Sequence, residues 1–489
     1  MKKFKNVIFW ATLFIIIFTI IAIKPLSDLD ELWNFNISRC ITNGMIPYKD
    51  ISMVVTPLFG LLLAIPLKIF GQELYIERLF LVILIFSIFI LEYNIMRKLK
   101  INKEISLLIT GLSIFVLQNS FVIGYNLLVL ILLMVIILIE LNQNKKEKSI
   151  KSDIFIGLLS GLIICTKQSM GIIISFVAIT NLLFFIKSKS DIKPVLKHIL
   201  FRLCGIVIPV IILLIYLIVN NALNDFLDYA IFGIKTFSNK LSYKILLYNK
   251  AYIATLSILV PIVLVISIIT NGVMKFKGKE NKNLFILTVY SLAMFSLIYP
   301  IPDANHFSLA IIPAIILTVF LIDLILKKYV KFNCKYIMEF LNIFTILGIL
   351  FASLYIELIN AETLGNLTKY NYEKHYKYVY VKDEVYNSIE EVNNYIKSSE
   401  KKVYILDATA SAYMIPLDRY NKDYDMFCIG NFGKNGEDGI IEKIKSEDAL
   451  YLIIKDSLNW QNPNNVRLYI KENMEYVSDI NGFEIYKNK

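Results

Sequence analysis

The stretch that decides the fold is Asn6-Val-Ile-Phe-Trp-Ala-Thr-Leu-Phe-Ile-Ile-Ile-Phe-Thr-Ile-Ile-Ala-Ile23, and the acidic cluster Asp28-Leu29-Asp30-Glu31 follows it closely. The apolar run is long enough to cross a bilayer as a helix. It is long for a secretory signal and no small-residue cleavage site follows it, so we expect a retained membrane helix. Carboxylates beside hydrocarbon are costly unless they have a task or a partner. The cluster therefore indicates a reaction site at the membrane surface.

The rest of the chain repeats this apolar pattern. Of its 489 residues, 56% are hydrophobic, the mean hydropathy is +0.60, and apolar runs alternate with short Lys-rich stretches. We therefore predict a polytopic α-helical membrane protein with about eleven transmembrane helices. The predicted helices are 6–23, 79–96, 105–118, 126–141, 154–165, 170–186, 203–219, 251–270, 284–298, 308–326 and 337–356.

The net charge of +11 is distributed as in a membrane protein. With the N-terminus placed inside, the segments assigned to the inside hold 24 Lys and Arg in 64 residues, and those assigned to the outside hold 10 in 107. Positive loops stay on the cytoplasmic side of a membrane. We therefore expect a multi-pass plasma-membrane protein with a cytoplasmic N-terminus and an extracytoplasmic C-terminal region, and we expect no nucleic-acid partner.

One apolar run does not fit the count of spanning helices. Residues 54–70 contain Pro57 and Pro66. A spanning helix here would place the basic run Arg97-Lys98-Leu99-Lys100 outside and invert every later loop. We expect instead interfacial or re-entrant helices within a long first outside loop, residues 24–78, packed on the helix bundle.

After Tyr355 the composition becomes that of a soluble domain, because residues 360–489 carry 17 Lys and Arg and 21 Asp and Glu. The patterns predict strands at 402–407, 449–455 and 482–486 and helices at 383–398 and 464–473. This alternation indicates a small extracytoplasmic α/β domain. No Gly-rich phosphate loop opens its helices, so we expect no nucleotide. The expected division is a transmembrane module, 1–358, and the α/β domain, 359–489.

Two compatible interpretations of the acidic cluster are open. As a general base, one carboxylate would take a proton from a hydroxyl or amine while its neighbour holds the acceptor or a cation. As a helix start, Ser27 or Asp28 would cap a helix running through Leu32-Trp33-Asn34-Phe35. Asp30 and Glu31 would then lie in its first turn, where the helix dipole favours carboxylates.

Further fragments accompany the cluster. They are Asp30-Glu31-Leu32-Trp33, Asn43-Gly44-Met45-Ile46-Pro47-Tyr48-Lys49-Asp50, Thr56-Pro57-Leu58, Phe70-Gly71, Arg78-Leu79, Gly161-Leu-Ile-Ile-Cys-Thr-Lys-Gln168, and His306-Phe-Ser-Leu followed by Pro313. Together they resemble the GT-C glycosyltransferases, in the branch of the protein O-mannosyltransferases and the lipid A aminoarabinose transferase. The first outside loop of that branch has an Asp-Glu pair, a Gly-x-x-Pro-Tyr-x-Asp segment, a Pro-Leu helix start and an Arg opening the second membrane helix.

The resemblance implies an inverting glycosyltransferase that takes a sugar from a polyprenyl-phosphate carrier. The acceptor would be a cell-envelope glycan, lipid or protein on the outer face. Asp30 would be the base and Glu31 its acidic partner, whereas Asp28 has no assigned role. Tyr48 and Asp50, from the Gly-x-x-Pro-Tyr-x-Asp segment, would bind substrate. Inversion requires one in-line displacement, with the lipid phosphate leaving from the face opposite the acceptor.

A departing phosphate needs positive charge to stabilise it. Lys167 is the first candidate, because it stands with Gln168 in a Thr-Lys-Gln sequence between two apolar helices. A lysine that snorkels at a helix end is the alternative. Arg39, Lys49 and Arg78 are expected at a similar depth, and Arg78 joins the predicted substrate-binding residues.

His306 and Asp303 form a second candidate contact for the donor, in the loop 299–307. They would bind its phosphate or sugar, or help to hold a divalent ion, although two residues are too few to assign a metal. A polar helix cap is the structural alternative.

Other acidic residues have structural interpretations. Arg78 could pair with Glu73 or Glu77 instead of binding a substrate. Glu92 and Glu140, near the cytoplasmic ends of their helices, are expected to be hydrated or paired with neighbouring Lys and Arg.

One position departs from the GT-C pattern. Many members of the family carry a second acidic residue in the loop after the third helix, but residues 118–126 contain no carboxylate, and Asn126 takes the place. We assign no cofactor: a divalent cation is the one candidate, and the missing carboxylate argues against it. The five cysteines show no CxxC pair and predict neither a zinc site nor a disulfide framework.

Two other classes of function remain open. A transporter or flippase of lipid-linked saccharides would more often show charged or Gly/Pro-broken positions at mid-helix, or two similar halves. The charges here gather at the outer surface, and no internal repeat is evident. A membrane-anchored binding protein that works through its outer domain does not explain so many helices.

Overall fold

The structure is a computed structural model that describes residues 2–22, 24–26, 29–121, 124–143, 149–186, 188–236, 241–329, 348, 374–455 and 462–489. Its backbone contacts divide the chain into two compact units, and each unit is built from segments far apart in the sequence. The helical unit comprises Met1–Ile21, Leu81–Leu213 and Leu241–Ile359. The mixed unit comprises Ala22–Phe80, Leu214–Lys240 and Asn360–Lys489.

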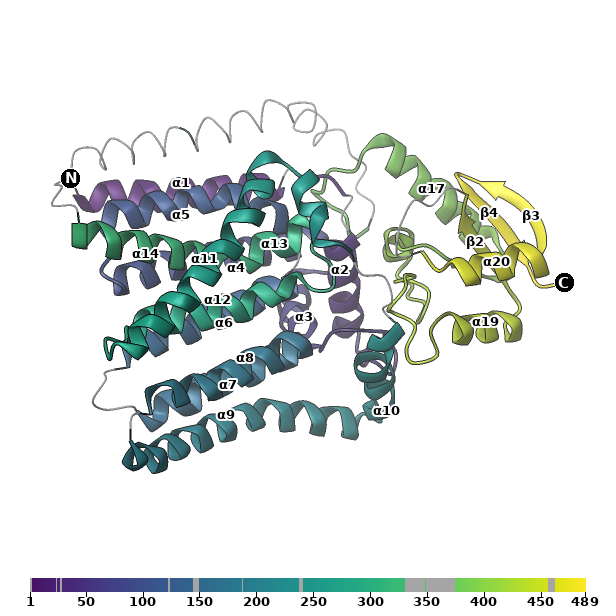
Figure 1. Ribbon diagram of the computed structural model, residues 1–489. Coiled ribbons are helices and arrows are strands. Elements are labelled where there is room, and N and C mark those ends of the chain that lie inside the picture. Colours follow the sequence, from purple (N-terminus) through teal and green to yellow (C-terminus); the bar gives the residue numbers. More distant parts are fainter. Residues whose placement is uncertain are drawn as a thin grey trace. The chain divides into compact units, whose positions relative to one another are not determined.

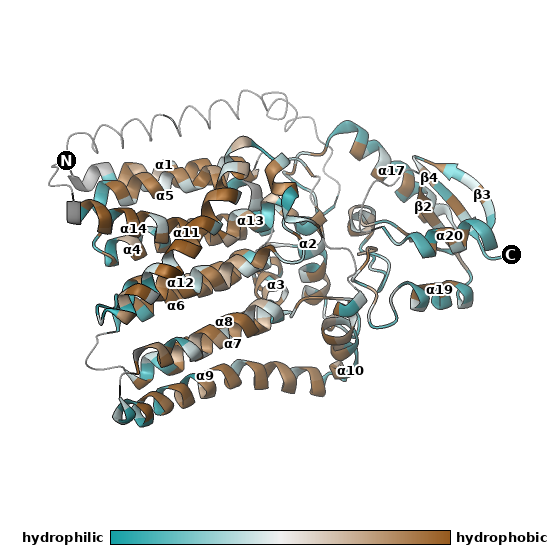
Figure 2. Ribbon diagram, viewed as in Figure 1, coloured by the Kyte–Doolittle hydropathy of each residue, from teal (hydrophilic) through white to brown (hydrophobic). Residues whose placement is uncertain are grey.

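The helical unit consists of apolar helices that run side by side (Figures 1 and 2). They are α1 (Lys2–Ala22), α4 (Leu74–Lys98), α5 (Lys103–Leu117), α6 (Gly124–Asn142), α7 (Ile150–Thr166), α8 (Gln168–Thr180), α9 (Ile192–Val219), α11 (Ala251–Phe276), α12 (Lys282–Phe295), α13 (Ala304–Ala310) and α14 (Ile312–Tyr329). The start of α4, up to Phe80, and the end of α9, from Leu214, belong to the mixed unit. Short 3₁₀ turns lie between them: η1 (Gln118–Ser120), η2 (Asn181–Phe185), η3 (Lys189–Asp191), η6 (Tyr243–Tyr248) and η7 (Ser296–Ile298).

Every helix predicted up to residue 326 is confirmed as helical. By length and composition α4, α6, the run Lys189–Val219 and α11 could each cross a membrane, and α13 with α14 adds a fifth span bent by 45°. The bend falls just before Pro313, whose missing N–H is tolerated in the first turn of α14. The predicted helix 337–356 lies outside the described residues apart from Gly348, so the number of eleven spans stays a prediction.

Helices α7 and α9 approach closely through glycines. Gly157 and Gly161, four residues apart on α7, lie against α9 near Gly205. A Cβ at Gly157 would come within 2.2 Å of the Arg202 carbonyl oxygen, and a Cβ at Gly205 within 2.3 Å of the Ile154 carbonyl oxygen. Glycine is therefore required for this backbone approach, which follows the small-xxx-small pattern of membrane helix pairs.

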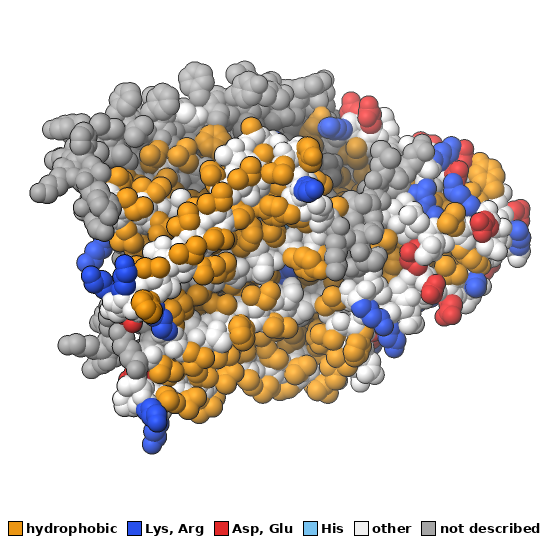
Figure 3. Space-filling view, viewed as in Figure 1, with side chains coloured by type: hydrophobic (Ala, Val, Ile, Leu, Met, Phe, Trp, Pro, Cys, Tyr) orange, Lys and Arg blue, Asp and Glu red, His pale blue; other side chains and the backbone are white. Residues whose placement is uncertain are grey.

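Helices α9 and α11 expose large apolar side chains. Figure 3 shows hydrophobic side chains covering the visible face over these helices. The exposed side chains include Leu196, Leu200, Val207, Ile208, Ile211, Ile212 and Ile215 of α9 and Ile258, Leu259, Ile262, Val265, Ile266 and Ile269 of α11. A surface of this kind is expected to face lipid. The chain is a membrane protein, as predicted, and the side on which its termini lie stays a prediction.

Arg202, Glu140 and Asp153 form a buried, paired group of charges inside the helical unit. Arg202 of α9 donates through Nη1 to Glu140 at 2.6 Å and through Nε to Asp153 at 2.8 Å. The three residues are each no more than 3% exposed. Glu140 is thus paired with an arginine, as expected. Glu92 is 0% exposed and accepts a hydrogen bond at 2.7 Å from the Ser113 hydroxyl, while its second oxygen has no hydrogen-bond partner among the described residues. The expectation that Glu92 is hydrated or paired with Lys or Arg is therefore wrong.

The first loop supplies two helices to the mixed unit, α2 (Leu29–Thr42) and α3 (Leu58–Phe70). α2 is the helix that the capping interpretation predicts, and its proposed caps, Ser27 and Asp28, lie outside the described residues. α3 has 13 residues and contains Pro66. A helix of that length is about 20 Å long, short of the roughly 30 Å hydrocarbon core. Its interfacial or re-entrant position stays a prediction.

The C-terminal part of the mixed unit is an α/β fold. Its helices and strands are α17 (Asp383–Ser398), β1 (Lys402–Ile405), α18 (Ala410–Met414), α19 (Gly436–Ser446), β2 (Ala449–Ile454), α20 (Asn464–Asn473), β3 (Glu475–Ile480) and β4 (Phe483–Lys487). The segment 214–240 adds α10 (Leu223–Phe226), the π turn η4 (Leu227–Phe232) and the 3₁₀ turn η5 (Gly233–Thr236), and η8 (Ile415–Leu417) follows α18. The strand order is β1-β2-β4-β3, with β1 parallel to β2 and β4 antiparallel to both its neighbours.

All five predicted elements of this domain are confirmed, while α18, α19 and β3 were not predicted. β3 is an edge strand whose side chains are exposed or half-buried, so it lacks the apolar alternation of a buried strand. Side chains of successive residues point to opposite faces of the sheet. One face packs against α19 and α20 and the other against α17 and α18. The expected domain boundary near residue 359 lies outside the described residues.

Candidate active site

Glu31 and Arg78 form a buried ion pair in the mixed unit. Nε of Arg78 donates to one carboxylate oxygen at 2.8 Å and Nη2 to the other at 2.9 Å. The Arg78 side chain is 4% exposed and that of Glu31 is 0% exposed. Sequence proximity suggests Glu73 or Glu77 as the partner of Arg78, but this two-point contact is made with Glu31. A planar, two-point contact fixes the orientation of both groups.

Asp30 precedes Glu31 on α2 and has a different environment. Successive helical residues point about 100° apart, so the two carboxylates face different directions. Asp30 is half-buried, whereas Glu31 is fully buried. Burial, with added effects from the charges of Asp30 and Asp407, raises the pKa of the Cys428 thiol to about 12. Because it is only half-buried, Asp30 keeps part of its surface accessible.

Tyr48 and Asp50 shape the loop in which they stand. The Asp50 carboxylate accepts a hydrogen bond from the Ile46 amide at 2.7 Å. Tyr48 has a positive φ of 68°, is 0% exposed, and donates its hydroxyl to the Val55 carbonyl at 2.8 Å. Both residues thus stabilise the turn, and their contact with a substrate stays a prediction.

Arg39 is the centre of a buried group that we call the α2 network: Asn36, Arg39, Ser411, Arg419 and Asp425. Arg39 is 1% exposed and donates through Nη2 to the Asn36 side-chain oxygen at 2.8 Å and to the Arg419 carbonyl at 3.0 Å. The Asn36 amide donates to Ser411 Oγ at 3.4 Å and to Asp425 Oδ2 at 3.5 Å. The hydrogen-bond donors of Arg39 are therefore used by Asn36 and Arg419, so its proposed depth near the donor phosphate is not accompanied by a donor directed to a ligand through Nη2.

Asp425 is the member of the network that sequence inspection missed. It is 1% exposed, and one of its oxygens has no hydrogen-bond partner among the described residues. Burial raises the pKa of Asp425 to about 7, against the opposing effects of Asn421, Arg39 and Asn36. It lies in a segment without helical or strand periodicity, so only its place in the fold reveals its burial.

Lys167 and Asn126 are brought together in the helical unit. Nζ of Lys167 donates to the Asn126 side-chain oxygen at 3.1 Å and lies 5.4 Å from the centre of the Tyr125 ring. Asn126 is 0% exposed, and its side-chain nitrogen has no hydrogen-bond partner within the described part of the chain. Lys167 separates α7 from α8 in an extended conformation, and Gln168, 8% exposed, opens α8. Positive charge thus gathers at a helix N-terminus, which favours an anion.

Asp303 and His306 are paired at the start of α13. The Asp303 carboxylate accepts the His306 backbone amide at 2.8 Å, and the two side chains meet at 2.9 Å through Nδ1. Burial raises the pKa of Asp303, but the hydrogen bonds and charge of His306 outweigh it, and the net pKa is lowered. Asp303 is therefore a helix cap that also orients the His306 ring. Within the described ranges, no three His, Cys, Asp or Glu side chains cluster closely enough to hold a metal.

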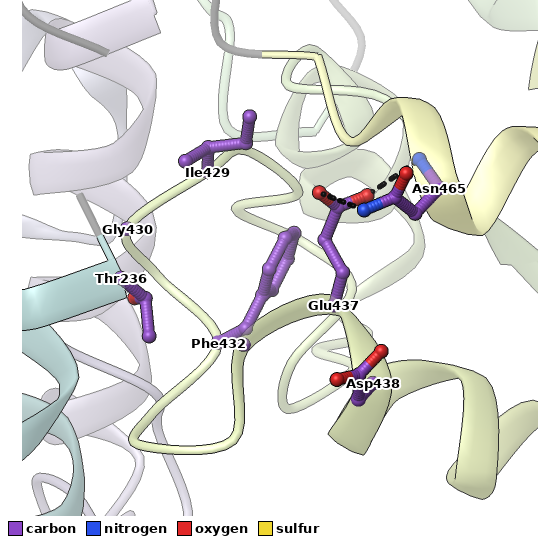
Figure 4. Close-up of a pocket in the computed structure, with 8 residues that line it drawn as sticks. Thr236, Ile429, Gly430, Phe432, Glu437, Asp438 and Asn465 are labelled. Carbon is purple, nitrogen blue, oxygen red and sulfur yellow. Dashed lines mark hydrogen bonds between the residues drawn. The ribbon is translucent and has the colours of Figure 1, made fainter. Parts of the chain in front are cut away.

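A polar cavity of about 180 Å³ lies in the mixed unit (Figure 4). Its lining includes Thr236, Phe432, Glu437, Asp438 and Asn465. The Glu437 carboxylate accepts hydrogen bonds from the backbone amide of Asn465 at 2.7 Å and from its side chain at 3.3 Å. Glu437 thereby caps α20, while Asp438 is exposed beside it.

The comparisons with solved structures show a shared fold, in line with the resemblance noted in the sequence. The crystal structure of ArnT from Cupriavidus metallidurans bound to undecaprenyl phosphate aligns with a TM-score of 0.58 and 12% identity, covering 100% of this chain and 99% of ArnT. Its apo structure aligns with a TM-score of 0.57 at the same identity. The likeness thus extends over both units and shows a shared fold.

A second likeness is to the oligosaccharyltransferase of Archaeoglobus fulgidus, solved in complex with Zn and sulfate. The TM-score is 0.50 at 12% identity, with 98% of this chain and 73% of that chain covered. No protein-family model and no curated protein sequence matches this chain. The likeness to these solved structures is therefore a likeness of fold.

Proposed function

We propose that this protein is a membrane glycosyltransferase that moves a sugar from a polyprenyl-phosphate donor to a cell-envelope acceptor on the outer face. The observation that carries the proposal is the GT-C fold over the whole chain, with an accessible Asp30 next to a buried, ion-paired Glu31. The undecaprenyl phosphate bound to ArnT supports a polyprenyl carrier of the same kind.

Asp30 is the proposed general base of an inverting displacement. Its carboxylate takes the proton from an acceptor hydroxyl or amine as the acceptor's electron pair bonds to the anomeric carbon. The bond from that carbon to the phosphate oxygen breaks, and its electron pair leaves with the lipid phosphate. Glu31, which the sequence pairs with Asp30 in catalysis, is assigned a structural task, because its two oxygens are occupied by Arg78.

Lys167 is the proposed contact for the donor phosphate. Its ammonium group, the amides of the first turn of α8 and the nearby Asn126 amide provide the charge and hydrogen bonds that a phosphate needs. His306, oriented by Asp303, is a second proposed contact. This assignment leaves Asp303 as a positioning residue.

The acceptor is proposed to contact the cavity beside α19. Its hydroxyl, amide and carboxylate groups, with Phe432 at one wall, suit a hydroxylated or aminated ring.

The test uses the full chain in lipid nanodiscs, with a panel of undecaprenyl-phosphate monosaccharides as donors, a cell-envelope extract as acceptor, and release of undecaprenyl phosphate measured by mass spectrometry. We expect release with at least one donor, and Asp30→Asn should lower it by about 10²- to 10⁴-fold, the usual contribution of a general base. Binding of undecaprenyl phosphate should survive Asp30→Asn and weaken in Lys167→Met. Asp448→Asn, at an exposed side chain, is the control. Full release by Asp30→Asn would refute the proposal.

A flippase of lipid-linked saccharides is the second candidate, and the buried charges of Arg202, Glu140 and Asp153 within membrane helices favour it. Liposomes that hold a fluorescent undecaprenyl-phosphate sugar separate the two functions. Movement of the lipid between leaflets without release of undecaprenyl phosphate would establish the flippase.

A further inference from the structure

Helix α2, which carries Asp30, is held from two directions within the mixed unit. Glu31 is fixed by Arg78 of α4. At about 100° of rotation per helical residue, Trp33 lies about 200° and Asn36 about 140° around the helix axis from Glu31. Both therefore lie on the side of α2 opposite to Glu31. Asp30 lies between these two sides, so the rotation of α2 about its axis decides where its carboxylate points.

The second set of contacts that fixes α2 is made by the segment between β1 and α19. The Trp33 indole Nε1 donates to the Ala408 carbonyl at 3.0 Å. One helical turn later, the Asn36 amide reaches Ser411 Oγ and Asp425 Oδ2. Ser411 in turn donates its hydroxyl to the Asp425 carbonyl at 2.8 Å, so Asn36 contacts groups that are themselves fixed.

Asn36 uses both ends of its side chain. Its oxygen accepts from Arg39 Nη2 at 2.8 Å, while its nitrogen donates to Asp425. Asn36, Arg39 and Asp425 are each 1% exposed. A buried polar group that loses its hydrogen-bond partner is destabilising, so the rotation of α2 that satisfies this network is favoured over any other.

We propose that Asn36 and Asp425 are positioning residues for Asp30: their buried contact sets the rotation of α2 and thereby the direction of the base. The assignment rests on the proposed function, in which Asp30 takes the acceptor proton. A misplacement of about 1 Å can lower a rate by roughly 10²-fold, so a contact at a distance from the chemistry is able to control it.

The experiment replaces Asn36 with Leu, which is similar in volume and makes no hydrogen bond, in the full chain in nanodiscs. With the undecaprenyl-phosphate sugar that gives release, kcat should fall by about 10- to 100-fold while KM for the donor stays within about twofold. Hydrogen exchange of the amides in 29–42 should rise. Asp425→Asn retains an oxygen for the Asn36 amide and should keep most of the activity, whereas Asp425→Leu should behave like Asn36→Leu. Asn473→Leu on α20 makes the same change at an exposed position and is the control.

Trp33→Phe is a milder variant for the case in which Asn36→Leu does not fold. It removes the indole N–H but retains an aromatic ring, and should lower kcat with the same unchanged KM. An unchanged kcat in these variants would overturn the proposal. A fall in kcat that merely parallels a fall in the thermal midpoint would also overturn it, because the loss of activity would then reflect lowered stability. A failure of the proposed function would give a different result: Asp30→Asn itself would then keep full release of undecaprenyl phosphate.

Discussion

At the scale of single residues, two adjacent carboxylates have different tasks. Asp30 keeps accessible surface, and Glu31 is buried against Arg78. The sequence identifies both as chemically important because they share a cluster at the edge of an apolar run. It does not separate them, because the separation depends on an arginine 47 residues away.

Replacement of Glu31 by Gln should be strongly destabilising. The change leaves the buried Arg78 guanidinium without its counter-charge, and breaking a buried ion pair costs about 3–5 kcal/mol. We expect a lower thermal midpoint in size-exclusion measurements of detergent-solubilised protein.

The matched control removes both charges of this pair. The double variant Glu31→Leu with Arg78→Leu should be more stable than Glu31→Gln alone, because no unpaired charge stays buried. A single variant as stable as the parent protein would show that the pair does not hold α2.

At the scale of elements, the approach of α7 to α9 depends on glycines. The sequence predicts both helices from hydropathy. It does not indicate that they touch, because an apolar helix gives no information about its neighbour. The two backbones come so close that a Cβ at Gly157 would collide with the Arg202 carbonyl oxygen.

Gly157→Val should therefore separate α7 from α9 and lower the yield of folded protein severalfold. Gly272→Val on α11 is the control, because a Cβ at Gly272 meets nothing within 4 Å. Fluorescence-detected size exclusion of tagged protein measures both variants. Equal yields for the two would contradict the close packing.

At the scale of the whole molecule, the mixed unit is assembled from three segments far apart in the sequence. The first loop contributes α2 and α3, and residues 374–489 contribute the sheet and the partners of Trp33, Asn36 and Arg39. The expected division at residue 359 follows the change in composition and stays a prediction, while the mixed unit also includes the first loop.

A chain that ends at residue 359 should therefore lose the order of its first loop. The buried face of α2 would be exposed, and limited proteolysis should cut within 24–78 much faster than in the full chain. Co-expression of residues 360–489 as a separate chain should restore part of the protection. A first loop that stays protected after truncation would contradict the shared unit.

The sequence by itself determined the local features of this protein: apolar runs became helices, alternating runs became strands β1, β2 and β4, and α17 and α20 begin and end where predicted. These features depend on neighbours within a few residues, so hydropathy and periodicity reveal them. The contact of Lys167 with Asn126, the pairing of Glu31 with Arg78, and the α2 network were decided only by the tertiary structure. Their partners are brought together by the packing of helices and loops, across as many as 389 residues for Asn36 and Asp425, and no local pattern encodes such a distance.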